Sequence, residues 1–592
     1  MHDDERRPSA QAQRLLREET RRNPDSALRR LDEKQRRLRQ VEAELERVKA
    51  QLKTATAARS GLRERIDALT SELERRPEHV ADLQTEKQPA GTADDAPDSV
   101  VVASGSAAST APEETTAPSP ADAADAEPSL EELEERLAEE PTSENLAACL
   151  SRLWFRHGRV MRGVELLESH PELIQDLDRN QRKLAERILG TPKLERDLPR
   201  VVPGRSEGAA YLPEQGRIMY CAYSTPSFHS NGYSVRTQGV VSGMKAAGAD
   251  VFVVARSGYP WDIRTVKDAP ARRRRHVAAV GGVDYVHLPE GDASTMRVDD
   301  YVQVAADSFV REARLRRPSL IHAASNFLNG LPALIAARRL GLSFVYEVRG
   351  LWEVTEASKT PGWAETERYA WQARMEAFVA SQADAVLAIT QETKDELVRR
   401  GVPAARIELL PNGVDSQSFL PLPRDEAYAA AHGLSKDVPV IGFAGSFVDY
   451  EGLEVLLQAA NILRGRKVRF QIALAGGGGV YPRLKRYKER QNLGSRVRFV
   501  GRRPAEEIPV FLSCVDIVAC PRQSLPVTEM VSPLKPLEAF AASKPVVLSD
   551  VSPHRALAGE QQQRGVLFEP GSPKALADAL QSLIEDAELR PA

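Results

Sequence analysis

From Arg217 to the C-terminus, short apolar runs rich in β-branched residues alternate with segments of helical spacing. Strands separated by helices form parallel sheets covered on both faces, so we expect an α/β protein. The runs fall into two blocks, which predicts two sheets. The first block contains Ile218–Tyr223, Val251–Ala255, Val283–Leu288, Leu320–Ala323, Phe344–Val348, Ala385–Ile389 and Ile407–Leu410. The second contains Val438–Ala444, Phe470–Ala475, Val497–Val500, Asp516–Ala519, Val546–Leu548 and a candidate edge strand, Val566–Phe568.

The chain of 592 residues is too long for one hydrophobic core and predicts about three or four units. A proline-containing stretch from Gln417 to Lys436 separates the two blocks and is the predicted hinge. The predicted order is a flexible N-terminus (1–26), a coiled coil (27–87), a disordered linker (88–128), a small helical element (129–195), a first sheet domain (214–420) and a second (436–592).

Apolar residues between Leu31 and Leu73 repeat at three- and four-residue steps, with charged residues between them. This heptad pattern predicts a coiled coil and a homodimer, with a higher oligomer or one solvated helix as alternatives. Residues Gln88 to Pro128 contain almost no large apolar side chains and predict a flexible tether. Helical spacing returns from Leu130 to Leu189, and one helical pair that packs on the following domain is expected.

Composition excludes several classes of partner. The formal net charge of -3 gives no field that would recruit nucleic acid, and the 4 cysteines are too scattered for a disulfide framework or a zinc site. Met1 to Arg22 offers no apolar core for a signal peptide, and no run approaches the ~20 residues of a membrane span. We expect a cytoplasmic protein with peripheral contact at the inner membrane face. The run Arg272–Arg275 is either a solvated cluster or a contact for an anionic acceptor or lipid.

The segment Ser532–Ala541 places a proline-bounded helix start beside a lysine and a carboxylate. Unpaired amides and the helix dipole favour an anion, Lys535 adds a charge suited to phosphate, and Glu538 can accept bonds from sugar hydroxyls. The segment therefore predicts a grip on a phosphate and a sugar. An ordinary helix start with exposed side chains is the alternative.

In the first block, Asn231 and Gly232 follow the first strand, where ligands bind in open α/β sheets. Glu347 and Arg349 end a buried strand, and buried charges need a reason to be there. They either pair with each other or act in a cleft. His229 is nearer the predicted ligand edge, whereas His322 is interpreted as structural.

The turn Pro411–Asp415 completes an ordered set of segments that resembles the retaining GT-B glycosyltransferases of glycosyltransferase family 4. The segments, in order, are the Gly232 loop, Ala255–Pro260, Glu347–Trp352, Pro411–Asp415, Gly442–Gly452, Ala475–Gly479, Val500–Arg502 and Pro533–Ala541. The "YEVRG" and "PLKPLEA" segments are similar to a polysaccharide-assembly subgroup. The resemblance implies two Rossmann-like domains facing a cleft, with the nucleotide-sugar in the second domain, the acceptor in the first, and no essential metal. The resemblance also implies a final helix that returns to the first domain; either this sequence is short of that helix or the N-terminal helical element fills its place.

The resemblance also implies residue roles, with departures. Glu538 corresponds to the ribose-binding second Glu of a Glu-x7-Glu motif, whereas Met530 stands at the first Glu and Glu529 is one residue out of register. Ser446 and Glu451 stand where an Arg and a Lys usually hold the diphosphate. Candidate replacements for that charge are Lys535 and Arg522, with Arg349. The full donor-binding set is Glu538, Lys535, Arg522, Gly445, Ser446, Gly477, Gly501 and Leu537; the catalytic candidates are Arg349, Glu347 and His229; the acceptor or phosphate loop is Asn231 and Gly232.

These observations predict a retaining glycosyltransferase that moves a sugar from a UDP- or GDP-type donor to a glycan, lipid-linked or small polyol acceptor. No cofactor and no metal ligand set are predicted. A catalytically degenerate scaffold organised by the coiled coil is one alternative, and a GT-B sugar epimerase is another.

Overall fold

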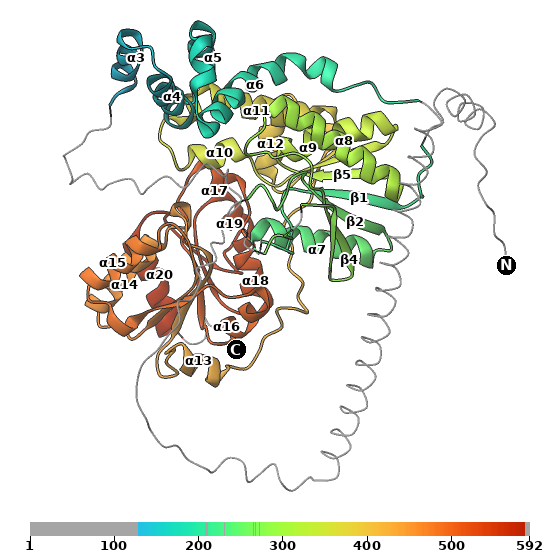
Figure 1. Cartoon of the computed structure of the whole chain (residues 1–592). Helices are drawn as coiled ribbons and strands as arrows, with labels where there is room; N and C mark the ends of the chain where they lie inside the picture. The colour runs from blue at the N-terminus through green and yellow to red at the C-terminus, as the bar shows by residue number, and fades with distance from the viewer. Residues whose placement is uncertain are drawn as a thin grey trace, which may run out of the picture. The chain divides into compact units, whose positions relative to one another are not determined.

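The computed structural model describes residues 128–586 except 208–210, 230, 264–265, 267 and 272. The predicted flexible N-terminus, coiled coil and all but the last residue of the linker lie outside the described residues, as do Ser230 and Arg272. The described chain contains two α/β lobes preceded by a helical element (Figure 1). No helix among the described residues is long and apolar enough to cross a bilayer.

The first lobe is built on an 8-stranded sheet with the order β3-β4-β2-β1-β5-β6-β7-β8. Its strands are β1 (Arg217–Ala222), β2 (Asp250–Ala255), β3 (His276–Val280), β4 (Val283–His287), β5 (Leu320–Ala324), β6 (Ser343–Val348), β7 (Ala385–Ala388) and β8 (Ile407–Leu409). All neighbouring pairs are parallel except β3 with β4. The seven predicted strands are confirmed, and the antiparallel edge strand β3 was not predicted.

The second lobe is built on a 6-stranded parallel sheet with the order β11-β10-β9-β12-β13-β14. Its strands are β9 (Val440–Ser446), β10 (Gln471–Gly477), β11 (Val497–Gly501), β12 (Ile517–Cys520), β13 (Val546–Ser549) and β14 (Val566–Phe568). Each corresponds to a predicted strand, including the edge strand. The predicted class of two Rossmann-like parallel-sheet domains is therefore confirmed.

Helices cover both faces of each sheet. The first lobe has α7 (Gly232–Ala246), α8 (Val298–Arg316), α9 (Phe327–Leu340), α10 (Trp352–Ala357), α11 (Glu367–Gln382) and α12 (Gln391–Arg399). The second has α13 (Glu426–Ala431), α14 (Leu453–Gly465), α15 (Tyr481–Arg490), α16 (Ile508–Ser513), α17 (Pro526–Met530), α18 (Lys535–Ala541), α19 (Ser552–Ala558) and α20 (Pro573–Glu585). Side chains of α8, α9 and α11 pack on one face of the first sheet and those of α7 on the other.

Local sequence accounts for where these helices begin. Asn231 caps α7 with its side chain, and Ser234 returns a bond to the Asn231 backbone, which satisfies two amide donors. One helix of the second lobe also reaches into the first lobe, because Val527 of α17 belongs to the core of the first sheet. The two lobes therefore share a packed contact.

The N-terminal element has four described helices where the spacing predicted one pair. They are α3 (Leu130–Glu139), α4 (Ser143–Arg152), α5 (Val160–Ser169) and α6 (Arg179–Val201). Leu150, Trp154 and Ile188 belong to a separate core of this element, whereas Leu194 and Leu198 of α6 join the core of the first sheet. The long helix α6 thus attaches the element to the first lobe.

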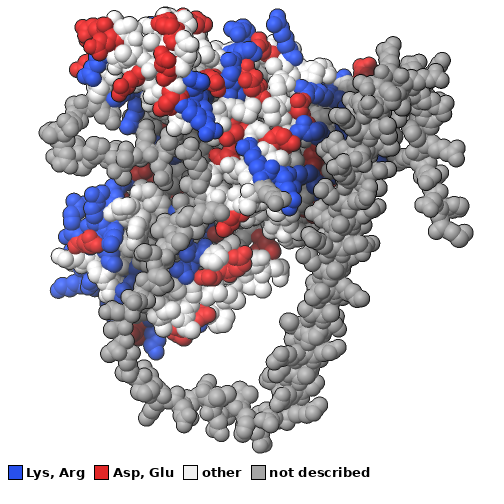
Figure 2. All heavy atoms as spheres, viewed as in Figure 1, with Lys and Arg blue, Asp and Glu red and all other residues white. Residues whose placement is uncertain are grey.

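The visible surface carries charges of both signs, in line with the balanced composition (Figure 2). Among the described helices, α15 has the densest basic group, because its sequence YPRLKRYKER places five Lys and Arg side chains on ten residues.

Candidate functional site

Glycines shape the carboxyl edge of the second sheet. At Gly445, with φ of 149°, an added Cβ would lie 2.3 Å from Cε of Lys535. At Gly476, an added Cβ would lie 1.8 Å from the carbonyl oxygen of Gly445. Any side chain at these two positions would clash, so the glycines let the Lys535 side chain lie across the end of β9.

A buried carboxylate joins the two cations that were predicted to replace the missing phosphate ligands. Glu451 Oε1 lies 2.7 Å from Nζ of Lys535 and 3.2 Å from NH2 of Arg522. Burial would raise the pKa of Glu451, but the charges of Lys535 and then Arg522 lower it to about 2. Two cations and one anion leave a surplus positive charge at the end of β9.

The cluster is only partly enclosed. The side chain of Lys535 is 19% exposed and its Nζ lies 5.2 Å from the centre of the Phe443 ring. Arg522 donates from NH1 to the carbonyl oxygen of Val531 at 2.8 Å. Among the described residues, Oε2 of Glu451 has no hydrogen-bond partner. Lys535 is therefore the member that can reach an incoming anion.

Glu538 lies one helical turn after Lys535 on α18 and is half-buried. Burial raises its pKa, and the charge of Lys535 opposes that shift. No described residue forms a hydrogen bond with its carboxylate. Pro536 has no N–H and Glu538 N donates to Leu534 O, so the first turn offers only the amides of Lys535 and Leu537.

The remaining donor-binding candidates lie on the same edge. Ser446 and Gly477 are paired at the ends of β9 and β10, and Gly501 ends β11 with φ of 79°. At Gly477 an added Cβ would lie 2.9 Å from Nε of Arg502. The structure thus brings Gly445, Ser446, Gly477 and Gly501 to the carboxyl edge that also carries Lys535.

Met530, at the place of the missing first Glu, joins the two lobes. Its side chain packs against the core of the first sheet, and its carbonyl oxygen accepts from Oγ1 of Thr390 at 2.5 Å. The neighbouring Glu529 accepts from the Ser552 amide at 2.8 Å and from the Ser524 hydroxyl at 2.6 Å. Glu529 therefore supports the start of α19 and does not replace the missing carboxylate.

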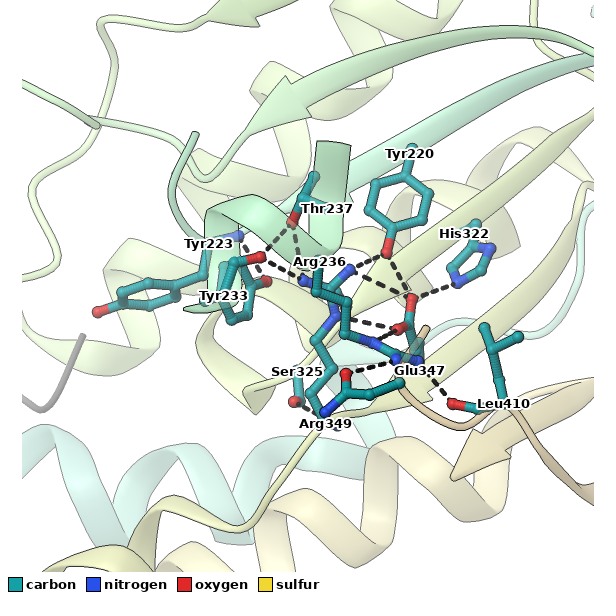
Figure 3. Close-up of polar contacts among 12 residues, drawn as sticks. Tyr220, Tyr223, Tyr233, Arg236, Thr237, His322, Ser325, Glu347, Arg349 and Leu410 are labelled. Atoms are coloured by element: carbon teal, nitrogen blue, oxygen red, sulfur yellow. Dashed lines mark hydrogen bonds and ion pairs between the residues drawn. The ribbon is translucent and has the colours of Figure 1, made fainter. Parts of the chain in front are cut away.

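In the first lobe, Glu347 is the centre of a buried polar network (Figure 3). Its Oε1 accepts from Nε of Arg236 at 2.8 Å and from Nε of Arg349 at 3.0 Å. Its Oε2 accepts from the Tyr220 hydroxyl at 2.5 Å and lies 3.3 Å from Nε2 of His322. Burial acts to raise the pKa of Glu347, but Arg349, His322 and Arg236 hold it well below the ordinary value.

The donors of Arg349 are fully used by this network. NH1 donates to Oγ1 of Thr237 at 2.7 Å and to the carbonyl of Tyr233 at 2.9 Å, and NH2 donates to the Tyr220 hydroxyl. Glu347 is 1% exposed and Arg349 is 7% exposed. Glu347 and Arg349 therefore form an ion pair, which was the alternative to a role in the cleft. The pair holds α7 against β1 and β6.

Arg236 was missed by the sequence reading and connects this network to the second lobe. NH2 donates to Leu410 O at 2.7 Å, and NH1 donates to Oδ1 of Asn412 at 2.9 Å. Asn412 then donates from Nδ2 to Ser532 O at 2.6 Å. The one sequence feature that could have predicted Arg236 is the buried Glu347, because a buried carboxylate needs more than one cation or hydrogen-bond donor.

His229 keeps one ring nitrogen available. Its Nδ1 lies 2.8 Å from the Tyr259 hydroxyl, and no described residue bonds its Nε2. Burial, followed by the charge of Arg256, lowers its pKa, so the ring is neutral at neutral pH. Gly232 nearby has nothing within 4 Å of an added Cβ, which leaves open space at the start of α7.

Among the described residues, no three His, Cys, Asp or Glu side chains form a group that could hold a metal ion. The candidate site consists instead of cations, carboxylates and glycine-lined backbone.

Two family models match the chain. One, described as glycosyl transferases group 1, covers residues 424–592, and the other, a glycosyl transferase 4-like domain, covers residues 231–413. The N-terminal match ends at residue 413, just before the predicted hinge at 417–436, and the C-terminal match begins inside that hinge at residue 424.

Relatives named as glycosyltransferases match this chain in sequence, and one solved structure is similar in fold. EpsF of Bacillus subtilis, named a glycosyltransferase, is 27% identical over 350 residues, which cover 56% of this chain and 83% of EpsF. The D-inositol 3-phosphate glycosyltransferase of Xylanimonas cellulosilytica is 30% identical over 270 residues, which cover 44% of this chain and 62% of that protein. A sucrose-phosphate synthase from Thermosynechococcus elongatus is similar in fold, with a TM-score of 0.52, 20% identity, and coverage of 63% of this chain and 91% of that chain.

Proposed function

Because residues 424–592 match the model of group 1 glycosyl transferases and residues 231–413 match that of a glycosyl transferase 4-like domain, we propose that this protein transfers a sugar from a nucleotide-diphosphate donor. The donor is of the UDP or GDP type, and the acceptor is a glycan, a lipid-linked molecule or a small polyol. The reaction retains the anomeric configuration and serves the synthesis of cell-surface polysaccharide or glycoconjugate.

The observation that carries this proposal is the cluster of Lys535, Arg522 and Glu451 at the carboxyl edge of the second sheet. A diphosphate needs positive charge, and in this cluster Lys535 and Arg522 supply it from positions different from those of the usual Arg and Lys. Glu538, one turn away, has a carboxylate with no partner among the described residues, so it can accept bonds from ribose hydroxyls.

Lys535 and Arg522 have a second role in the reaction. When the bond to the sugar breaks, negative charge develops on the leaving diphosphate, and fixed cations stabilise that charge without rearranging. Glu347 and Arg349 hold the start of α7 in place and do not contact substrate. His229, neutral and with Nε2 available, is the proposed contact to the acceptor hydroxyl.

The names of relatives support the class of substrate. Five of the matched proteins are named D-inositol 3-phosphate glycosyltransferases and one is named a GDP-mannose-dependent mannosyltransferase. These names concern sugar donors and phosphorylated polyol or lipid acceptors, and the proposal for this chain falls within that range.

A catalytically inactive scaffold is the second candidate, favoured by Met530, Ser446 and Glu451 at positions where the family usually has charged ligands. Calorimetric titration with UDP, GDP and ADP separates the two. Binding of one nucleotide, followed by transfer or hydrolysis in a panel of radiolabelled sugar-nucleotides, supports the enzyme. Absence of binding to all three nucleotides supports the scaffold, and turnover of the donor to an epimer supports the third alternative.

We also propose a homodimer through residues 27–87 and a peripheral location at the inner face of the cell membrane. Light scattering of the whole chain beside a chain that begins at residue 128 tests the dimer. If the particles in both samples contain the same number of chains, a dimer through residues 27–87 is contradicted.

A further inference from the structure

Two guanidinium groups of the first lobe and its N-terminal element have no acidic partner. Arg187 lies on α6 and Arg368 lies in the first turn of α11, and both are half-buried. In the part of the chain that the structure describes, no carboxylate lies within ion-pair distance of either one. Most of the other buried or half-buried arginines here have such a partner, as Arg349 and Arg522 do.

Arg368 is held between aromatic rings. Its guanidinium lies 4.3 Å from the centre of the Trp154 ring and 5.2 Å from that of Trp363, and NH1 donates to Trp154 O at 3.2 Å. The indole N–H groups of both tryptophans have no acceptor among the described residues. The surroundings of Arg368 are therefore rich in donors and poor in acceptors.

Arg187 approaches the same place from the N-terminal element. Its NH2 donates to Ala293 O at 2.8 Å. Trp154, whose ring contacts Arg368, belongs to the same core as Ile188, the residue next to Arg187, so the two cations lie in one part of the molecule. Burial is the larger cause of the lowered pKa of Arg368, and the positive charge of Arg187 lowers that pKa further. The acids whose charges act on the two arginines have partners of their own, because Asp292 accepts from Ser294 and Glu356 lies 3.8 Å from Lys359.

The arginine pair lies on the side of the first lobe where its strands end. Tyr223, the residue after β1, acts on the pKa of Arg187, and its ring centre is 4.7 Å from that of Trp352. Trp352 begins α10, two residues after Gly350, where an added Cβ would lie 3.3 Å from Val531 of the second lobe. This side of the first lobe therefore approaches Val531, four residues before Lys535.

We propose that Arg187 and Arg368 together bind a phosphate group of the acceptor, so that the acceptor is a phosphate-bearing sugar, polyol or lipid. This inference rests on the proposed glycosyltransferase function. Guanidinium groups bind phosphate through paired hydrogen bonds, and an anion between them relieves the repulsion of two uncompensated charges.

The N-terminal element then has a direct role in recognition. Arg187 precedes both matched regions, which begin at residues 231 and 424. The helices α3 to α6 would supply half of an acceptor subsite that the two sheet domains do not contain on their own.

Calorimetric titration of the full chain with inorganic phosphate tests the inference. The variants are Arg187→Gln, Arg368→Gln and Lys535→Gln, since the donor cluster also attracts phosphate. Arg196→Gln is the matched control, because this arginine lies on the same helix, is 72% exposed and is 3.9 Å from Asp197.

We expect a phosphate site that persists in Lys535→Gln and Arg196→Gln and is weakened about tenfold or more in Arg187→Gln and Arg368→Gln. Equal phosphate binding by all variants, no phosphate site in the wild type, or loss in Lys535→Gln alone would overturn the proposal. Nucleotide affinity measured on the Arg187→Gln, Arg368→Gln and Arg196→Gln samples shows that these three variants are folded. It also separates this inference from the proposed function, which fails only when the wild type binds no nucleotide.

Two further probes identify the source of the phosphate. Glucose 6-phosphate is compared with glucose, and vesicles of phosphatidylglycerol are compared with vesicles of phosphatidylcholine. Binding that depends on Arg187 supports a soluble sugar phosphate in the first comparison and a lipid headgroup in the second. Absence of Arg187-dependent binding in both comparisons counts against the proposal.

Discussion

Glu451 and Lys535 are 84 positions apart in the chain, and their side chains meet at 2.7 Å at the carboxyl edge of the second sheet. The carboxylate occupies the position at which the resemblance to family 4 glycosyltransferases implies a lysine, and a lysine reaches this place from α18 instead. The positive charge at this place is therefore supplied from another part of the sequence, with a carboxylate as its internal counter-ion.

Removing that counter-ion should strengthen nucleotide binding. In Glu451→Gln, the cluster changes from one surplus positive charge to two, and we expect the affinity for UDP or GDP to rise about 3- to 10-fold. Calorimetry measures the affinity, and Glu454→Gln, which removes a more exposed carboxylate three residues later, is the control. Unchanged or weaker binding in Glu451→Gln would show that the diphosphate does not contact this cluster.

Removing the residues proposed to bind the donor should slow the reaction. We expect Lys535→Gln and Glu538→Gln each to lower turnover about 10- to 1000-fold, because they hold the diphosphate and the ribose. Steady-state kinetics with the identified donor measure the loss. Lys574→Gln, an exposed lysine paired with Asp578, should be unaffected. Wild-type turnover in both site variants would remove these assignments.

The buried ion pair also predicts a dependence of stability on pH. The pKa of Glu451 falls from 4.5 to about 2 on folding, so its contribution is fully present above about pH 4.5 and is lost as the pH falls toward 2. The shift corresponds to at most about 3 kcal/mol. Urea unfolding between pH 3 and 6 should show a smaller acid loss in Glu451→Gln than in the wild type. Parallel curves for the two proteins would contradict this account.

The network around Glu347 should be needed for stability. In Arg236→Gln the carboxylate loses one of its cations, and the free energy of unfolding should fall by about 3–5 kcal/mol. Arg339→Gln, which removes a surface pair with Asp307, should change it by less than about 1 kcal/mol. Denaturant titration measures both. Similar losses in the two variants would mean that the buried network stabilises the fold no more than a surface ion pair does.

Metal removal should leave the reaction intact, since Lys535 and Arg522 provide the charge for the diphosphate. We expect full activity in excess EDTA, and no gain when Mg²⁺ or Mn²⁺ is added afterwards. An activity that disappears with EDTA and returns with Mg²⁺ would show that the cations of the protein are not sufficient.

The sequence was sufficient for most of the two sheets because their buried strands are continuous apolar runs. It failed at β3, where exposed and half-buried residues alternate along His276–Val280 after a run of arginines. Gly281 and Gly282, both with positive φ, close the tight turn to β4 and were the overlooked hairpin signal.

The candidate site was predictable in part. Lys535 and Glu538 were predicted from the helix start that carries them, because such starts have recognisable neighbours, whereas Arg522 was predicted only as a replacement for the charge that the resemblance implies; the structure brings Arg522 and Lys535 together at Glu451. The partnership of Glu451 with Lys535 was not predictable, since a pair so distant in sequence leaves no local pattern. Arg236 was missed for the same reason: its partners come from β6 and from the loop after β8.

The bond from Asn412 to Ser532, together with Val527 seated in the neighbouring core, bears on how this protein can be divided for engineering. Cleaving the chain between residues 417 and 436 would separate these contacts. The first fragment would leave the side-chain amide of Asn412 without its acceptor, and the second would expose Val527 to solvent. The two fragments should therefore be co-expressed, because each one buries the surface that the other would otherwise expose.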